Sequence, residues 1–375
     1  MKLLMISGDR SVLQGKKGAF WYTLEELCKH FERVDVICPR VKNEQLKMNN
    51  EQLRNNKELF ENVFFHSCTL GLWYQPRWIV KKGRKLIKEH HHDTMTVHDY
   101  PPFYNGIGAK KLSRKTGIPY AVEIHHIVGY PRAGSITEFI GKWMSRLYLK
   151  IDVRNAKSVR CVSSGVSDVL KKWKIPPYKV SVVPSFYLNR DLFKKDTSAK
   201  KIYDVVVCAR LVANKGILNV IKAMADLPQA LLLVVGDGPD RARLEAIAKS
   251  LKIDDRVKFS GWLPEIQDVY GAIQSGKVFV MNSKSEGGPR IALEAMALGM
   301  PIVTTKVGVM PDVIKDGQNG IFTKGNSKDL ADKLNKLLSD ESLQDRIGNE
   351  AQKILDKFER KDLIKQYSNF LKNLA

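Results

Sequence analysis

Cysteines and aromatic residues are scarce in this chain. Five cysteines stand among 375 residues, and no two have the Cys-x-x-Cys spacing of a zinc site. A small secreted domain held together by disulfides would carry more of them, at closer intervals. We therefore predict buried free thiols in a reducing cytoplasm, with neither a structural metal nor a disulfide.

Long apolar runs are also missing. No stretch approaches the roughly 20 consecutive apolar residues that a membrane-spanning helix needs. The opening segment, Met1 to Gly8, is short and leads into a glycine, which favours a first parallel strand over a signal peptide. With 43% hydrophobic residues, the composition is that of an ordinary globular protein long enough for two domains. We expect a cytoplasmic protein.

Acidic residues are few relative to basic ones, and the imbalance is uneven. The formal net charge is +22, of which +17 belongs to residues 1–198. Such an excess indicates an anionic partner of the N-terminal half: a membrane surface, a lipid phosphate, an acidic polymer or nucleic acid. Solubility alone is the simpler explanation.

Short β-branched and apolar runs alternate with helical patterns along the whole chain. This rhythm is typical of the α/β class, with doubly wound parallel sheets. The expected strands lie near residues 2–7, 34–38, 62–65, 94–97, 119–124, 158–162 and 180–183, and then near 204–207, 231–235, 257–259, 278–281 and 302–304. The polar stretch from Lys194 to Lys201 is the best candidate for a linker between two domains.

The most informative motif is Glu286-Gly287-Gly288-Pro289-Arg290-Ile291-Ala292-Leu293-Glu294. A proline after two glycines is typical of the start of a helix that a ligand approaches closely. The first-turn amides of such a helix can hold a diphosphate, and two carboxylates can accept hydrogen bonds from hydroxyl groups. This combination fits a nucleotide sugar.

Further motifs precede this one in order: Ala209-Arg210-Leu211 with Lys215-Gly216, Val235-Gly236-Asp237-Gly238-Pro239, and Phe259-Ser260-Gly261-Trp262. Together with Glu-x7-Glu, the run from Ala295 to Pro301 and Gly317-Gln318-Asn319-Gly320, they resemble the donor site of retaining glycosyltransferases of family 4, also called group 1. The resemblance implies the GT-B fold, in which two Rossmann-like domains face each other across a cleft. It places an acceptor domain at 1–190 and a donor domain at 199–360, with a terminal helix at 361–375 that crosses back onto the first domain.

The resemblance also implies roles for individual residues. Arg210 and Lys215 would stabilise the departing diphosphate, Glu286 would hold hydroxyls of the donor sugar, and Glu294 would hold the ribose diol. The phosphates would meet the backbone at Gly287 and Gly288. The remaining expected donor contacts are Pro289, Arg290, Gly236, Trp262 and Leu263. No divalent cation or other cofactor is expected, because side chains supply the positive charge.

The N-terminal half offers weaker signals. Gly15 and Gly18 frame a loop that opens an apparent helix, where amides could face the sugar, the phosphates or the acceptor. His98 and His125 each stand at the end of a strand, where open α/β sheets bind ligands, and in the related family a histidine at the position of His125 lies beside the donor sugar. We expect His90-His91-His92 to be exposed. Ser185-Phe186-Tyr187-Leu188 departs from the family, which tends to carry Asn-Gly-Val-Asp there.

We therefore predict a metal-independent, retaining hexosyltransferase that uses a UDP- or GDP-sugar and a glycan or lipid-linked acceptor, in the synthesis of cell-surface polysaccharide or glycolipid. Two alternatives stay open. A sugar-nucleotide epimerase has the same architecture but needs acid and base residues that we do not identify. A nucleic-acid-binding protein would explain the charge, but no recognised binding motif is present, so nucleic acid is not expected as a partner.

A second hypothesis concerns the membrane. From Trp73 to Lys88 the sequence interleaves six cations and two tryptophans without an acid. A basic helix of this kind can lie peripherally in the headgroup layer of anionic lipid. Alternatively, its apolar residues, Trp78, Ile79, Leu86 and Ile87, pack into the core while the cations stay in water.

Overall fold

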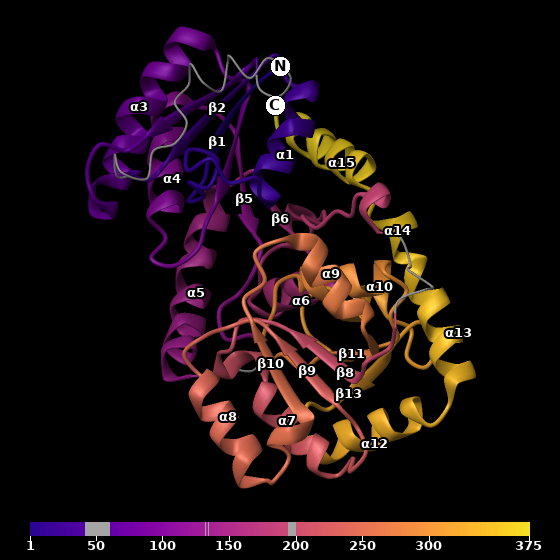
Figure 1. The fold of residues 1–375 in the computed structure, drawn as a ribbon. Helices are drawn as coiled ribbons and strands as arrows, with labels where there is room; N and C mark the ends of the chain where they lie inside the picture. Colours follow the sequence, from indigo (N-terminus) through magenta and orange to yellow (C-terminus); the bar gives the residue numbers. More distant parts are fainter. Residues whose placement is uncertain (42–60, 132, 134, 194–199) are drawn as a thin grey trace.

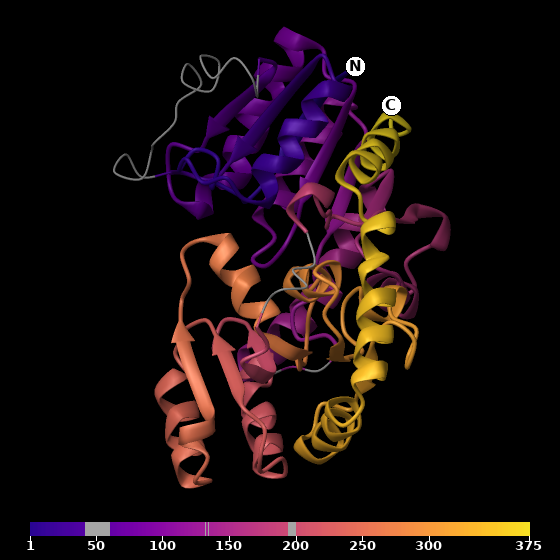
Figure 2. The ribbon, with the colours of Figure 1, turned by 45° about the vertical axis from the view of Figure 1, so that its right-hand side comes forward.

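The computed structural model describes residues 1–41, 61–131, 133, 135–193 and 200–375. They form two parallel sheets with helices on both faces, stacked one above the other (Figures 1 and 2). The α/β class is confirmed. Most of the expected linker, Lys194 to Lys201, lies outside the described residues, and the domain limits 1–190 and 199–360 stay predictions.

The first sheet has the strand order β3-β2-β1-β4-β5-β6-β7, and every neighbouring pair is parallel. Its strands are β1 (Lys2–Ile6), β2 (Arg33–Cys38), β3 (Val63–Ser67), β4 (Thr94–His98), β5 (Tyr120–Ile124), β6 (Ser158–Cys161) and β7 (Val180–Val182). Its helices are α1 (Ala19–Leu27), α3 (Gln75–His90), α4 (Tyr104–Thr116), α5 (Ile136–Asn155) and α6 (Ser164–Lys172).

The second sheet has the order β10-β9-β8-β11-β12-β13, again with parallel neighbours. Its strands are β8 (Tyr203–Cys208), β9 (Leu232–Val235), β10 (Val257–Gly261), β11 (Gly276–Met281), β12 (Ile302–Thr305) and β13 (Ile321–Thr323). Its helices are α7 (Ile217–Ala225), α8 (Arg241–Ser250), α9 (Ile266–Gln274), α10 (Arg290–Ala297), α11 (Met310–Val313), α12 (Ser327–Leu338), α13 (Glu341–Gln352) and α14 (Ile354–Lys357). Strand β13 is the one that the sequence reading missed, because three residues after a turn give too little periodicity.

The last helix, α15 (Arg360–Lys372), packs on the first sheet rather than the second. Its apolar side chains, Leu363, Ile364, Tyr367 and Leu371, are buried, and Arg360 donates to Glu25 on α1 at 2.7 Å. In Figure 2 the yellow C-terminal segment runs along both halves of the molecule. The chain therefore crosses between the two sheets twice.

The position of helix α3 shows that the apolar residues of its basic segment pack inwards. Ile79 and Leu86 are buried in the core beneath the first sheet, and Trp78 and Ile87 pack partly against it. The cations Lys81, Arg84 and Lys85 are exposed, so the helix presents charge but no broad apolar face to the outside.

Two expectations about side chains have clear outcomes. The five thiols are free, and those of Cys38, Cys68 and Cys161 are buried. The expectation that all of His90-His91-His92 are exposed is wrong for His92, whose Nε2 lies 2.8 Å from an oxygen of the buried Asp35. A buried carboxylate needs hydrogen-bond partners, and His92 supplies one. No helix among the described residues is long and apolar enough to span a membrane.

Candidate active site

The loop between β11 and α10 forms the floor of the candidate site. Helix α10 begins at Arg290, one residue after the expected start, with Pro289 as its N-cap residue. The amides of Ala292 and Leu293 donate to the carbonyl of Pro289, which closes the first turn. The amides that precede this turn point out of the helix, and its dipole favours an anion there.

A cavity of about 460 Å³ lies at this helix end, at the carboxyl edge of the second sheet. Nine of the expected site residues line it: Arg210, Lys215, Gly236, Trp262, Leu263, Glu286, Gly288, Pro289 and Arg290. They come from four separate stretches of sequence, and parallel strands bring them together because all their carboxyl ends lie on one edge. Trp262 forms an open wall and is largely exposed.

Charges of both signs meet inside this cavity. Lys215, at the end of a short 3-10 turn after β8, donates a hydrogen bond from Nζ to Oε1 of Glu286. Both side chains are mostly shielded from solvent, whereas Arg210 is exposed at the end of the same strand. The pocket therefore offers a paired ammonium and carboxylate beside an exposed guanidinium.

Glu294 does not line the cavity but lies just beneath it. Its side chain is only 5% exposed, and its Oε1 accepts a hydrogen bond from Nε of Arg290 at 2.8 Å. Tyr270 on α9 makes a further side-chain hydrogen bond to it. Burial raises the pKa of Glu294, and the neighbouring Arg290 opposes that rise. Arg290, which lines the cavity, therefore fixes the position of the Glu294 carboxylate.

The two glycines of the motif are required by packing between the two halves of the molecule. A Cβ on Gly287 would lie 2.0 Å from the carbonyl oxygen of His125, and one on Gly288 would overlap the ring of Phe186 at 1.5 Å. Ser285, just before them, donates from Oγ to the carbonyl of Tyr130 at 2.7 Å. This loop therefore touches the first half of the chain directly.

A second cavity of about 310 Å³ adjoins the first, and Arg290 lines both. Its walls from the first half include Asp9, Ala19, Phe20, Thr23, His98, His125 and Arg160. Ala19 is the first residue of α1, and Gly18 is the N-cap of that helix. Gly15 adopts a positive φ of 70° in the preceding turn and does not line this cavity.

His125 is held by a buried carboxylate. Its Nε2 lies 3.3 Å from Oε2 of Glu123, and the same oxygen accepts from Nη1 of Arg160 at 2.6 Å. Hydroxyl groups of Thr96 and Tyr367 donate to the other oxygen. Desolvation by burial lowers the pKa of His125, whereas Arg160 and the histidines keep the pKa of Glu123 well below its usual range.

His98, Glu123 and His125 also place their ligand atoms within 4.8 Å of one another, which is compatible with a metal ion. The donor set does not fit one well. A divalent cation bound to Glu123 would stand beside the guanidinium of Arg160, and it would compete with hydroxyl donors that already occupy that carboxylate. The triad is better explained as a device that orients His125.

The sequence reading missed several residues of these cavities. Arg160 lines the second cavity, and Glu123 is the buried carboxylate that it shares with His125. Both lie inside strands without a motif around them, so only the fold brings them together. Phe186 was noted only as a departure from a family pattern, yet its ring fills the space beside Gly288. Of the expected residues, Gly15, Gly18, Gly287 and Glu294 lie outside the lining of both cavities.

Comparison with solved structures defines the class of protein. The chain superposes over its full length on the Anabaena protein HepE in complex with UDP, with a TM-score of 0.77 and 20% identity. It covers 98% of sucrose-phosphate synthase from Thermosynechococcus elongatus, with a TM-score of 0.79 and 18% identity over the whole of this chain. At such identities the likeness establishes the fold, which is that of GT-B glycosyltransferases.

Sequence models place the chain more narrowly. Residues 20–187 match the model described as Glycosyltransferase Family 4, and residues 189–354 match Glycosyl transferases group 1. The protein belongs to this family of glycosyltransferases. A curated relative, the N-acetyl-alpha-D-glucosaminyl L-malate synthase of Bacillus anthracis, is 27% identical over 329 residues, which cover 83% of this chain and 84% of that protein.

Proposed function

We propose that this glycosyltransferase transfers a hexose, with retention of configuration, from a UDP-sugar to a hydroxyl group of a glycan or a lipid-linked acceptor. The observation that carries the proposal is the cavity in which Arg210, Lys215 and Glu286 meet the N-terminus of α10. UDP is preferred over GDP because the structurally similar HepE is solved with UDP.

The cavity suggests how the donor binds. The diphosphate lies at the N-terminus of α10, where Arg210 and Lys215 add positive charge. Glu286 accepts hydrogen bonds from sugar hydroxyls, and its contact with Lys215 fixes its position. The ribose meets Arg290 and Glu294, and the base stacks near Trp262 and Leu263.

Transfer with retention requires that the new bond form on the face that the leaving group departs from. The bond between the anomeric carbon and the diphosphate oxygen breaks, the acceptor oxygen bonds to the same face of that carbon, and the acceptor proton passes to the diphosphate. Arg210 and Lys215 stabilise the charge that develops on the leaving oxygen. His125, whose pKa is lowered by desolvation, lines the adjoining cavity and can hydrogen-bond the sugar from there.

We also propose that the reaction needs no divalent cation. Two cationic side chains of the cavity take the place of a metal at the diphosphate. Turnover in the presence of excess chelator tests this point, and a complete loss of activity that Mg²⁺ or Mn²⁺ restores would contradict it.

The donor proposal is tested by melting shifts with a panel of UDP-, GDP- and ADP-sugars, because a ligand that binds only the folded state raises Tm. We expect UDP-sugars to give the largest shift. Glu286→Ala should lower turnover more than UDP affinity, measured by calorimetry with the bare nucleotide. A salt-sensitive shift with nucleic acid and none with any nucleotide sugar would refute the proposal.

The positive charge of the first half of the chain is the basis of our proposal for the acceptor and for the place where the enzyme works. A lipid-linked acceptor would bring the enzyme to the cytoplasmic face of a membrane as a peripheral protein, which agrees with the net positive charge of residues 1–198. Product analysis with radiolabelled donor and extracted lipid, compared with soluble oligosaccharide, distinguishes the two acceptor classes.

A further inference from the structure

Helix α5 turns a wide apolar stripe towards solvent. Seven large apolar side chains on it are between 39% and 80% exposed: Ile136, Phe139, Ile140, Trp143, Met144, Leu147 and Ile151. At 100° per residue they occupy an arc of about 140° on one side of the helix. In a globular protein an arc of this width normally faces the core.

The helix attaches to the protein through its other side. Its buried residues are Ser145, Leu149, Asp152 and Val153, all from the middle of the helix onward. Tyr148 adds a stacking contact with Phe103, with ring centroids 4.8 Å apart. The first half, from Ile136 to Met144, contributes no buried residue. The stripe is therefore a contiguous exposed apolar surface, which in soluble proteins marks an interaction site.

Basic residues accompany this stripe. Arg146, Lys150 and Arg154 follow one edge of it at intervals of one helical turn. The acids of the helix are Glu138 near its start and Asp152, which is buried. No acid of α5 itself therefore borders the stripe along its second half.

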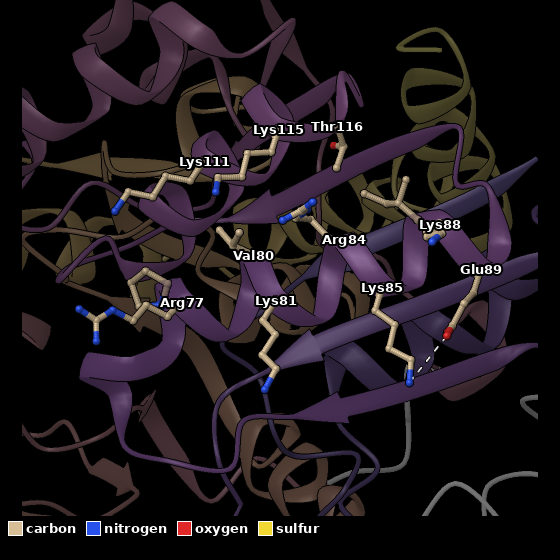
Figure 3. A pocket seen from close by; sticks show the side chains of 12 residues that line it. Arg77, Val80, Lys81, Arg84, Lys85, Lys88, Glu89, Lys111, Lys115 and Thr116 are labelled. Atoms are coloured by element: carbon tan, nitrogen blue, oxygen red, sulfur yellow. Dashed lines mark ion pairs between the residues drawn. The ribbon is translucent and has the colours of Figure 1, made fainter.

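Helix α4 contacts both α5 and α3, and the groove between α3 and α4 is strongly cationic. Figure 3 shows this groove, whose basic lining consists of Arg77, Lys81, Arg84, Lys85, Lys88, Lys111 and Lys115. One acid, Glu89, lines it and lies 3.7 Å from Lys85. Helices α3, α4 and α5 thus pack on one face of the first sheet, with α4 in contact with the other two (Figure 1).

We propose that α5 is an interfacial helix that inserts its apolar stripe into the headgroup layer of an anionic bilayer. Aromatic and aliphatic side chains enter the acyl boundary, while Arg146, Lys150 and Arg154 reach lipid phosphates. The cationic groove adds attraction that decays over about 10 Å at moderate salt. This assigns the insertion to α5 and leaves α3, whose apolar residues pack inside, with an electrostatic role.

A second copy of the chain is a poorer occupant for the stripe. In a two-fold pair of α5 helices the contact is self-complementary, so the row of Arg146, Lys150 and Arg154 would meet no acidic row on the α5 helix of the second copy. An anionic lipid surface neutralises the same row.

The stripe begins close to the rim of the donor cavity. Pro131, five residues before α5, forms a bridge with Ser285, the residue next to Glu286. Docking of α5 would therefore hold the cleft at the bilayer surface, where the lipid-linked acceptor of the proposed function lies. Only this last point rests on the proposed function, because binding of α5 to lipid needs neither donor nor acceptor.

The test is co-sedimentation of the full chain with vesicles of phosphatidylcholine containing 30% phosphatidylglycerol. We expect Trp143→Ser combined with Leu147→Ser to lower the partition coefficient at least tenfold. A matched control, Tyr178→Ser with Ile202→Ser, removes two exposed apolar side chains elsewhere and should change it less than twofold. Equal binding of both double variants would overturn the proposal.

A second pair of variants tests the charges. Arg146, Lys150 and Arg154 changed together to Gln should weaken binding to the anionic vesicles at least fivefold and flatten its salt dependence. The control changes three exposed lysines of the second half, Lys222, Lys249 and Lys336, to Gln and should leave binding nearly unchanged. Equal binding by both triple variants would show that Arg146, Lys150 and Arg154 have no specific role in binding the membrane.

Three further measurements keep the test independent of folding and of catalysis. Brominated lipid should quench the tryptophan fluorescence of the wild type more than that of Trp143→Phe. This replacement is conservative, so the comparison does not depend on a destabilised variant. Light scattering should show that Trp143→Ser with Leu147→Ser has the same mass as the wild type. A wild-type dimer that this change dissociates would assign the stripe to a second copy. Retained UDP binding by a variant that no longer binds vesicles would separate failure of α5 docking from failure of the proposed function.

Discussion

Replacement of Glu294 by Gln tests how the nucleotide is held. Glu294 is buried, accepts from Arg290 at 2.8 Å and is proposed to reach the ribose hydroxyls. Gln keeps the shape and one acceptor oxygen but loses the charge. Hydrogen bonds to charged groups contribute about 1.5 to 3 kcal/mol and neutral ones about 0.5 to 1.5 kcal/mol, so each hydroxyl contact weakens by about 1 kcal/mol.

One or two such contacts correspond to about 1 to 2 kcal/mol, or roughly a 5- to 30-fold rise in the Kd of UDP. Glu294→Ala should cost more, because it removes the acceptor and leaves Arg290 without its buried partner. Isothermal calorimetry with UDP measures both variants. Melting curves without ligand serve as the control for stability.

A comparison with 2′-deoxy-UDP locates the contact. If Glu294 binds the ribose, the wild type should lose affinity for the deoxy nucleotide, whereas Glu294→Gln should lose less, which gives a coupling free energy in a double-mutant cycle. Glu286→Gln, assigned to the sugar, should show no coupling to the same change. Additive losses in the Glu294 cycle would refute the ribose assignment.

Three other predictions follow from the described contacts. Arg210→Ala and Lys215→Ala should each lower turnover by roughly 10²-fold with unchanged melting temperatures, and near-normal rates in both would exclude their role at the diphosphate. The carboxyl of Asp99 is buried beside Asp152, and burial raises its pKa to about 9, so the folded state keeps a proton that the unfolded state releases above about pH 4. Stability should therefore fall as pH rises from about 4 to 9, and Asp99→Asn should flatten melting temperature against pH; an unchanged slope would contradict this. Tyr367→Phe should lower stability by about 1 to 3 kcal/mol, because Glu123 loses a buried donor, and an unchanged urea midpoint would speak against that contact.

The periodicity of the sequence was sufficient for the fold class, because parallel strands buried on both faces are continuous apolar runs. The donor cavity could also be anticipated, since Arg210, Gly236 and Glu286 each follow such a run and parallel strands end on the same edge. The roles of these residues stay predictions. What the motif did not indicate is that Gly287 and Gly288 face His125 and Phe186, because contacts between the two halves have no local pattern.

Helix α5 shows a different limit of prediction from sequence. Its residues from Ile136 to Ile151 have the spacing of an amphipathic helix, and such spacing alone favours burial of the apolar side. In the structure, Ser145 and Asp152 lie on the buried side, because Asp152 lies beside Asp99 in the core. A sequence pattern reports which side of a helix is apolar, but the fold decides which side is inside.

The contact between Tyr367 and Glu123 also bears on how the protein is made. The two residues are 244 positions apart, so at 5 to 20 residues per second Tyr367 is synthesised roughly 10 to 50 s after its partner. During this interval the first half of the chain has its strands but lacks the helix that covers them, and the carboxylate that orients His125 has lost one of its donors. The first half should therefore not be a stable product on its own. Expression of residues 1–190 alone would leave apolar surface open to aggregation, whereas co-expression with a fragment that carries α15 should restore it.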